Sequence, residues 1–142
     1  MNLIWAFENA FRRKAEKNWD CIYVAIDIHS TIFKPTYDSH EKYDYYTFAK
    51  ETLRMMSRNR NVKLIIWSSS HKDALEGYLK KLESDSIHID YVNCNPEVED
   101  IDIASFKDKF YFNVGIDDKF GFDANVDWYQ LHGYFLGKAL ER

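Results

Sequence analysis

The sequence predicts an α/β protein built on a parallel β-sheet that is covered on both faces. Continuous apolar runs alternate along the chain with segments in which apolar residues recur at helical spacing. Strands buried on both faces carry such continuous runs, whereas a strand with one wet face alternates apolar and polar residues. The chain has 142 residues, of which 46% are hydrophobic. It is long enough for a core of its own, and we expect one domain over residues 1–142.

The first element is expected to be an amphipathic helix over residues 1–18, appended to the core. Leu3, Phe7 and Phe11 recur at every fourth position, and a basic stretch follows them. We expect this helix to pack on the body of the protein or on a second copy, so a homodimer stays open. A helix on a membrane surface is disfavoured because Glu8 and Glu16 interrupt its basic face.

The rest of the chain alternates between strand and helix. The expected strands are the segments rich in apolar residues at 21–27, 62–67, 87–92 and 110–116. The expected helices lie between or after them, over residues 45–58, from Ser70 through Leu82, and from Asp127 onwards. The three serines after the second strand favour a helix start. The polar, acidic stretch 93–105 contains Pro96 and is expected to be a loop.

Charge, cysteine content and apolar run length disfavour several classes of function. The net charge of −4 argues against a nucleic-acid surface. Two cysteines make neither a disulfide framework nor a zinc site, which favours a reducing, cytoplasmic compartment. No apolar run approaches the roughly 18 residues that cross a bilayer, and the start of the chain lacks the order of a secretory signal. We therefore expect no membrane partner.

Polar groups follow the ends of all four expected strands. Asp27 ends the first, Ser68 and Asn93 follow the second and third, and Asp117 and Asp118 follow the fourth. Because the carboxyl ends of parallel strands meet at one edge of a sheet, a ligand site is expected there. Carboxylates suit a hard divalent cation, and one of them can act as a nucleophile. With a hydroxyl and a lysine, this set matches the needs of phosphoryl transfer.

The order of these residues resembles the four motifs of the haloacid dehalogenase-like (HAD) superfamily. The residues that carry the resemblance are Asp27 with Thr31, then Ser68, then Lys109, then Asp117-Asp118. The likeness extends from Cys21 to about Trp128, and the segment from Lys109 to Asp123 is similar to the fourth-motif region of small bacterial and phage members. The resemblance implies a Rossmann-type, three-layer α/β/α fold. Because the loops are short, it also implies that there is no separate cap domain.

The resemblance also implies Mg²⁺-dependent phosphatase chemistry. Asp27 would attack the phosphate ester and pass through an aspartyl-phosphate. Mg²⁺ would be bound by Asp27, the backbone carbonyl of His29, and Asp117 or Asp118. The phosphate would be held by side chains of three motifs, namely Thr31, Ser68 and Lys109, with Lys107 as the alternative lysine.

One position departs from the family pattern. His29 and Ser30 stand where the family has a second Asp and a Gly. That Asp protonates the leaving group and then activates water, and a histidine is also capable of acid–base work. Our hypothesis is a slow or selective phosphatase in which His29 takes this role. The alternative is a catalytically impaired protein on the same scaffold that binds a phosphorylated ligand without hydrolysis.

Several of these residues also have simpler interpretations. Ser68 suits a helix cap, Lys109 a solvated charge and His29 a loop histidine. A receiver-like signalling domain is disfavoured because the acidic pair follows the fourth strand rather than the first. The expected ligand is a phosphorylated small molecule or a nucleotide, and a nucleic-acid end stays open. The tyrosines at 43, 45 and 46 are expected to pack against the first helix or to stack on a substrate ring.

Overall fold

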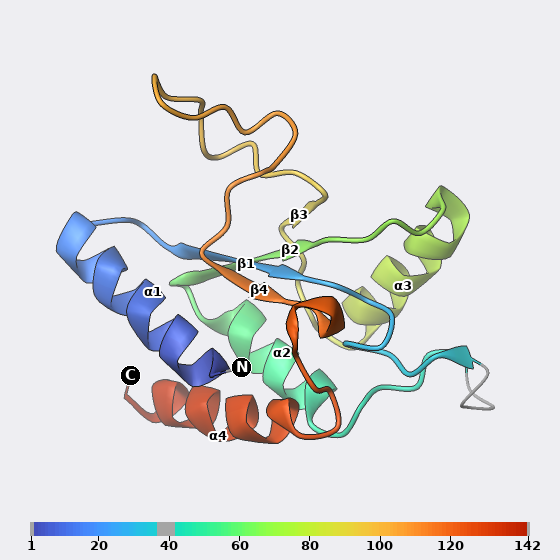
Figure 1. The fold of residues 1–142 in the computed structure, drawn as a ribbon. Helices are drawn as coiled ribbons and strands as arrows, with labels where there is room; N and C mark the ends of the chain where they lie inside the picture. Colours follow the sequence, from blue (N-terminus) through green and yellow to red (C-terminus); the bar gives the residue numbers. More distant parts are fainter. Residues whose placement is uncertain (1, 37–41, 142) are drawn as a thin grey trace.

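The protein folds around a four-stranded parallel sheet, as seen in a computed structural model that describes residues 2–36 and 42–141. Figure 1 shows the sheet at the centre of the molecule. The strand order is β3-β2-β1-β4, with β1 (Ile22–Ile26) between β2 (Val62–Ile66) and β4 (Val114–Ile116), and β3 (Tyr91–Val92) outside β2. The predicted α/β class and parallel sheet are confirmed.

The helices α1 (Leu3–Lys17), α2 (Ala49–Arg58) and α4 (Asp127–Leu140) pack together on one side of the sheet (Figure 1). The ring of Phe7 in α1 meets that of Phe135 in α4 edge-on, with centroids 5.0 Å apart. The first helix therefore packs on the body of the protein, one of its two expected roles. The connection from β2 to β3 is α3 (Lys72–Ser84), which contributes Tyr78 and Leu82 to the same core.

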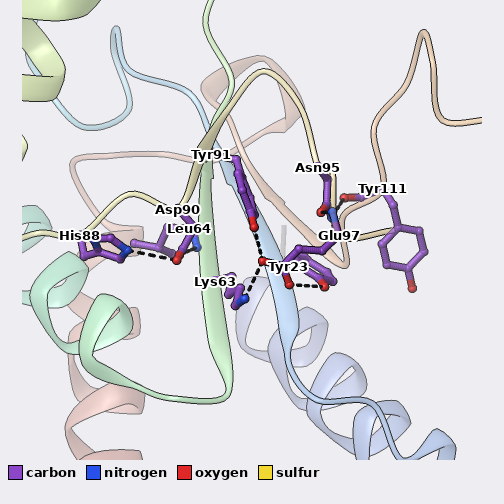
Figure 2. Close-up of polar contacts among 9 residues, drawn as sticks. All are labelled: Tyr23, Lys63, Leu64, His88, Asp90, Tyr91, Asn95, Glu97 and Tyr111. Atoms are coloured by element: carbon purple, nitrogen blue, oxygen red, sulfur yellow. Dashed lines mark hydrogen bonds and ion pairs between the residues drawn. The ribbon is translucent and has the colours of Figure 1, made fainter. Parts of the chain in front are cut away.

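Segment 93–113 leaves the sheet on the side opposite these three helices (Figure 1). Figure 2 shows how Glu97 anchors this segment to the sheet. The Glu97 carboxylate accepts hydrogen bonds from Tyr23 of β1 (3.1 Å) and Tyr91 of β3, and it pairs with Lys63 of β2 (2.5 Å). Side chains alternate along a strand, so Tyr23 and Lys63 point away from the core that their neighbours fill. The loop expected at 93–105 is part of this covering segment.

The third and fourth strands are shorter than the apolar runs predicted. In each case a side-chain oxygen, rather than a backbone carbonyl, accepts the N–H of the neighbouring strand where the pairing would start. The Asp90 carboxylate accepts the N–H of Leu64 (2.9 Å), and the Asn113 side-chain carbonyl accepts the N–H of Tyr23 (2.8 Å). Regular pairing therefore begins only at Tyr91 and at Val114. The expectations over 87–92 and 110–116 placed these strands correctly but extended them too far.

Among the described residues, no helix combines the length and the apolar character needed to cross a bilayer.

Candidate functional site

Three carboxylates converge at the carboxyl edge of the sheet. Ile26 of β1 pairs with Ile116 of β4, so the residues that follow, Asp27 and Asp117, emerge side by side. The Asp27 N–H donates to the carbonyl of Ile116 (2.9 Å) and continues the ladder by one step. Oxygen atoms of Asp27, Asp117 and Asp118 all lie within 4.8 Å of one another. The sequence predicted this convergence from the two strand ends.

Thr31 is hydrogen-bonded to two residues of the acidic cluster. Its side chain is fully buried, and its hydroxyl donates to the carboxylate of Asp27 (3.2 Å) while it accepts the N–H of Asp118 (3.2 Å). The carbonyl of Thr31 in turn accepts the indole N–H of the buried Trp128 on α4 (2.7 Å). The observed contacts of Thr31 are thus to the acidic residues, and the phosphate contact expected of it stays a prediction.

Burial and mutual repulsion make the ionised cluster costly without a cation. Burial, followed by the charge of Asp117, raises the pKa of Asp27 to about 7, although the Thr31 hydrogen bond lowers it. Burial raises the pKa of Asp117 as well, and the N–H of Lys119, which donates to its Oδ1 (2.9 Å), lowers it. Within the described part of the chain, no lysine or arginine forms an ion pair with any of the three carboxylates.

The donor set fits a hard cation such as Mg²⁺. Mg²⁺ takes oxygen ligands, and the cluster offers three carboxylates from two strand ends. The backbone carbonyl of His29 is available as a further ligand, because among the described residues it accepts no backbone hydrogen bond. The backbone hydrogen bonds of this loop are accepted by neighbouring carbonyls and do not use that of His29. The N–H groups of Thr31, Ile32 and Phe33 donate to Ile28, and that of Ser30 donates to Phe33.

His29 is close to Asp27 in the sequence, but its side chain is hydrogen-bonded to a residue of α3. Its Nε2 is 2.7 Å from the hydroxyl oxygen of Tyr78. The imidazole itself is exposed, whereas Tyr78 is 8% exposed. Ser30 adopts a left-handed conformation with φ of 59°. Glycine tolerates that conformation at lower cost, so the loop accepts some strain here.

Ser68 follows β2 and is held in place by Asn93, which follows β3. The Ser68 N–H donates to the Asn93 side-chain oxygen (2.8 Å), and the Asn93 amide donates back to the Ser68 carbonyl (2.9 Å). The Ser68 hydroxyl accepts the N–H of Ser70 (3.1 Å). It does not cap α3, whose first turn is preceded by His71, so the expected serine cap was wrong. The phosphate contact of Ser68 stays a prediction.

The two lysine candidates are exposed and lie on segment 93–113, ahead of β4. Within the described residues, neither Lys107 nor Lys109 forms a hydrogen bond or ion pair with the carboxylates. Phe110, next to Lys109, packs on Trp67 with ring centroids 5.4 Å apart. The backbone at Lys109 therefore passes near the residue that precedes Ser68. Lys119, which sequence reasoning did not select, is the cation whose charge lowers the pKa of Asp117.

Two of the tyrosines after the first loop, Tyr43 and Tyr45, pack against Phe33 and α3 rather than against the first helix. Tyr43 and Tyr45 contact the ring of Phe33 at centroid distances of 5.8 and 4.6 Å, and Tyr43 also contacts Tyr78 at 5.5 Å. The expectation that they cover the first helix was wrong, because that helix lies on α4 instead. These aromatic rings surround the residue that holds His29.

The carboxylate cluster opens to solvent at the sheet edge. Asp118 and His29 are both exposed. A cavity of about 650 Å³ lies elsewhere, between segment 93–113 and the amino-terminal part of β1, where Trp19, Tyr23, Phe106 and Tyr111 line it. None of the three carboxylates lines that cavity. A ligand can therefore reach the acidic cluster from solvent on the side of Asp118 and His29.

Comparison with known proteins identifies a fold relative. No family model and no curated protein matches the chain. The structure is similar to that of a conserved protein from Bacteroides thetaiotaomicron, with a TM-score of 0.61 and 21% sequence identity. The match covers 83% of this chain and 92% of that one. At this identity the likeness shows the fold alone.

Proposed function

We propose that this protein is a Mg²⁺-dependent, HAD-like hydrolase of phosphate esters that uses Asp27 as its nucleophile. The observation that carries the proposal is the cluster of three carboxylates within 4.8 Å, which forms no ion pair with a lysine or arginine among the described residues. Like charges at this distance repel and favour protonation. A divalent cation is the simplest group that balances them, and the donors are those that Mg²⁺ prefers.

In this proposal Mg²⁺ is held by Asp27, the His29 carbonyl, and Asp117 or Asp118. When bound, it neutralises charge on the phosphate and on the carboxylates. An oxygen of Asp27 attacks phosphorus, the ester oxygen leaves, and an aspartyl-phosphate forms that water then hydrolyses. His29 gives a proton to the leaving oxygen and later takes one from the water. Thr31 holds Asp27 and Asp118 in place, and Ser68 binds a phosphoryl oxygen.

The substrate is proposed to be a phosphorylated small molecule or a nucleotide that enters from solvent. The open sheet edge also admits a bulkier group, such as a nucleic-acid end. A cytoplasmic location is part of the proposal, since Cys21 and Cys94 are both free thiols, as a reducing compartment favours.

The test is phosphate release from a broad panel of phosphate esters, measured with Mg²⁺ and with a chelator. We expect Mg²⁺-dependent release from the wild type and none from Asp27→Asn, whose amide is not a nucleophile. Asp108→Asn, an exposed aspartate outside the cluster, is the matched control and should keep full activity. Hydrolysis that persists in a folded Asp27→Asn variant would remove Asp27 from its role.

Binding without turnover is the second candidate. It is favoured by His29, a histidine at the position where the HAD resemblance implies an acid–base aspartate. In that case Mg²⁺ and inorganic phosphate together should raise the melting temperature of the wild type, while no ester in the panel releases phosphate. Multiple turnovers on any ester would exclude this candidate.

A further inference from the structure

We propose that Tyr78 is the positioning residue for His29. Its hydroxyl holds Nε2 of the imidazole, so that Nδ1 is left to exchange the proton with the leaving group and the water. This inference rests on the proposed function. It assigns a role to a residue on a different element of the fold, which no motif identifies.

The hydrogen bond joins an exposed side chain, that of His29, to a buried and closely packed one, that of Tyr78. His29 Nε2 and the Tyr78 hydroxyl oxygen are 2.7 Å apart, and the two rings meet edge-on at 88° with centroids 5.0 Å apart. Tyr78 is buried and stacks on Phe33 at 5.6 Å and 24°, while Tyr43 abuts it at 5.5 Å and 78°. The hydroxyl therefore has little freedom to move. The exposed imidazole would sample several rotamers without this hydrogen bond.

A tyrosine hydroxyl suits both protonation states of the imidazole. It accepts from Nε2–H or donates to an unprotonated Nε2, because a hydroxyl is both donor and acceptor. Among the described residues, Nδ1 of His29 has no hydrogen-bond partner. Which ring nitrogen carries a proton is set by the bond that the other makes. Anchoring Nε2 to Tyr78 thus leaves Nδ1 as the working atom.

His29 loses one proton in the first step and regains one in the second. As the Asp27 oxygen bonds to phosphorus and the bond from phosphorus to the ester oxygen breaks, the Nδ1 proton passes to the leaving oxygen. Water then attacks phosphorus and gives its proton to Nδ1, and the Asp27 carboxylate is released with inorganic phosphate. Nε2 keeps its hydrogen throughout and donates it to the Tyr78 hydroxyl oxygen.

The kinetic test compares two leaving groups in Tyr78→Phe, which keeps the ring and removes the hydroxyl. Glycerol 2-phosphate leaves as an alkoxide that needs a proton, whereas 4-nitrophenyl phosphate leaves as a stable phenolate. In single-turnover measurements of alcohol release, which precede the attack of water, we expect the rate for glycerol 2-phosphate to fall about tenfold, a fraction of the full effect of general acid catalysis. The single-turnover release of 4-nitrophenolate should change by less than about twofold, because its departure needs no acid.

Tyr43→Phe is the matched control, since it removes a hydroxyl from the same aromatic cluster without touching His29. It should leave both rates unchanged. An equal loss of the single-turnover rate on both esters in Tyr78→Phe would show a merely structural role and overturn the inference. So would a Tyr78→Phe variant that hydrolyses glycerol 2-phosphate at the wild-type rate.

A second readout needs neither Mg²⁺ nor turnover. Long-range ¹H–¹⁵N NMR spectra of the metal-free protein report the ring nitrogens of each histidine, and His29 is assigned by its loss in His29→Asn. We expect the Nε2 resonance of His29 to shift in Tyr78→Phe and to stay in place in Tyr43→Phe. An unchanged resonance in Tyr78→Phe would overturn the inference. Wild-type protein that hydrolyses neither ester while its Nε2 resonance responds to Tyr78→Phe would overturn the proposed function but not the Tyr78 contact.

Discussion

Neutralising Asp27 should stabilise the metal-free protein at neutral pH. The ordinary pKa of an aspartate is 3.8, and burial beside Asp117 raises that of Asp27 to about 7 in the fold. The unfolded chain therefore ionises Asp27 near pH 4, while the folded protein retains the proton up to about pH 7. Unfolding releases a proton in this window, so the free energy of unfolding falls as pH rises from about 4 to about 7 and is level above that.

The magnitude follows from the size of the shift. About three pKa units at roughly 1.4 kcal/mol each set a ceiling of about 4 kcal/mol. Water reaches the cluster on the side of the exposed Asp118, and this screening lowers the expected effect to about 2 kcal/mol. Asp27→Asn cannot ionise, so it should be more stable than the wild type by about that amount at pH 8, with the difference closing near pH 4.

The assay is urea unfolding followed by circular dichroism in the presence of a chelator, at several pH values between these limits. Asp108→Asn controls for the loss of an exposed aspartate and should track the wild type. Added Mg²⁺ should raise the stability of the wild type and not that of Asp27→Asn. Parallel pH profiles of wild type and Asp27→Asn would refute the reasoning, because the fold would then not raise the pKa of the Asp27 carboxylate.

Three further predictions concern other residues of the proposed site. Thr31→Val removes the hydroxyl that joins Asp27 to the Asp118 backbone, so it should lower the free energy of unfolding by about 1–3 kcal/mol in urea titrations. The same variant should weaken Mg²⁺ binding, measured by calorimetry, by about 10-fold or more, as loss of a residue that orients metal ligands typically does. His29→Asp places a carboxylic acid at the proposed acid–base position and should raise the steady-state turnover of 4-nitrophenyl phosphate through the step in which water attacks; a rate that does not rise means that His29 does not limit turnover. Lys109→Met should raise KM for a phosphate ester more than Lys119→Met if Lys109 binds the phosphate, and the opposite order would assign that role to Lys119.

The carboxylate cluster was predictable because it depends on strand ends and strand order. The run before Asp27 and the run before Asp117 were both readable as buried strands, and a parallel sheet brings their carboxyl ends to one edge. Their exact pairing needed the structure, since nothing local in the sequence states that β4 lies next to β1. The limits of β3 and β4 were less predictable, because the side chains of Asp90 and Asn113 replace backbone partners there.

The residues that support the site were harder to identify from the sequence. Trp128 and Tyr78 occupy ordinary apolar positions of helical patterns, where an aromatic side chain indicates only packing. Their polar atoms nevertheless make the contacts that matter, one to the Thr31 carbonyl and one to His29. A signal did exist for Trp128, because a buried tryptophan N–H needs an acceptor. No sequence rule pointed that donor to a loop so far away in the chain.

These contacts explain how a strained cluster persists in the fold. The three carboxylates lie at the meeting point of β1, β4 and the loop after β1, and the loop is tied to α4 through Trp128. Core packing of that tryptophan, which is fully buried, fixes Thr31, and Thr31 fixes Asp27 and Asp118. The apolar core thus offsets repulsion that would otherwise spread the carboxylates apart. A cation that binds there gains from ligands already in position, so its affinity and the stability of the fold must rise and fall together.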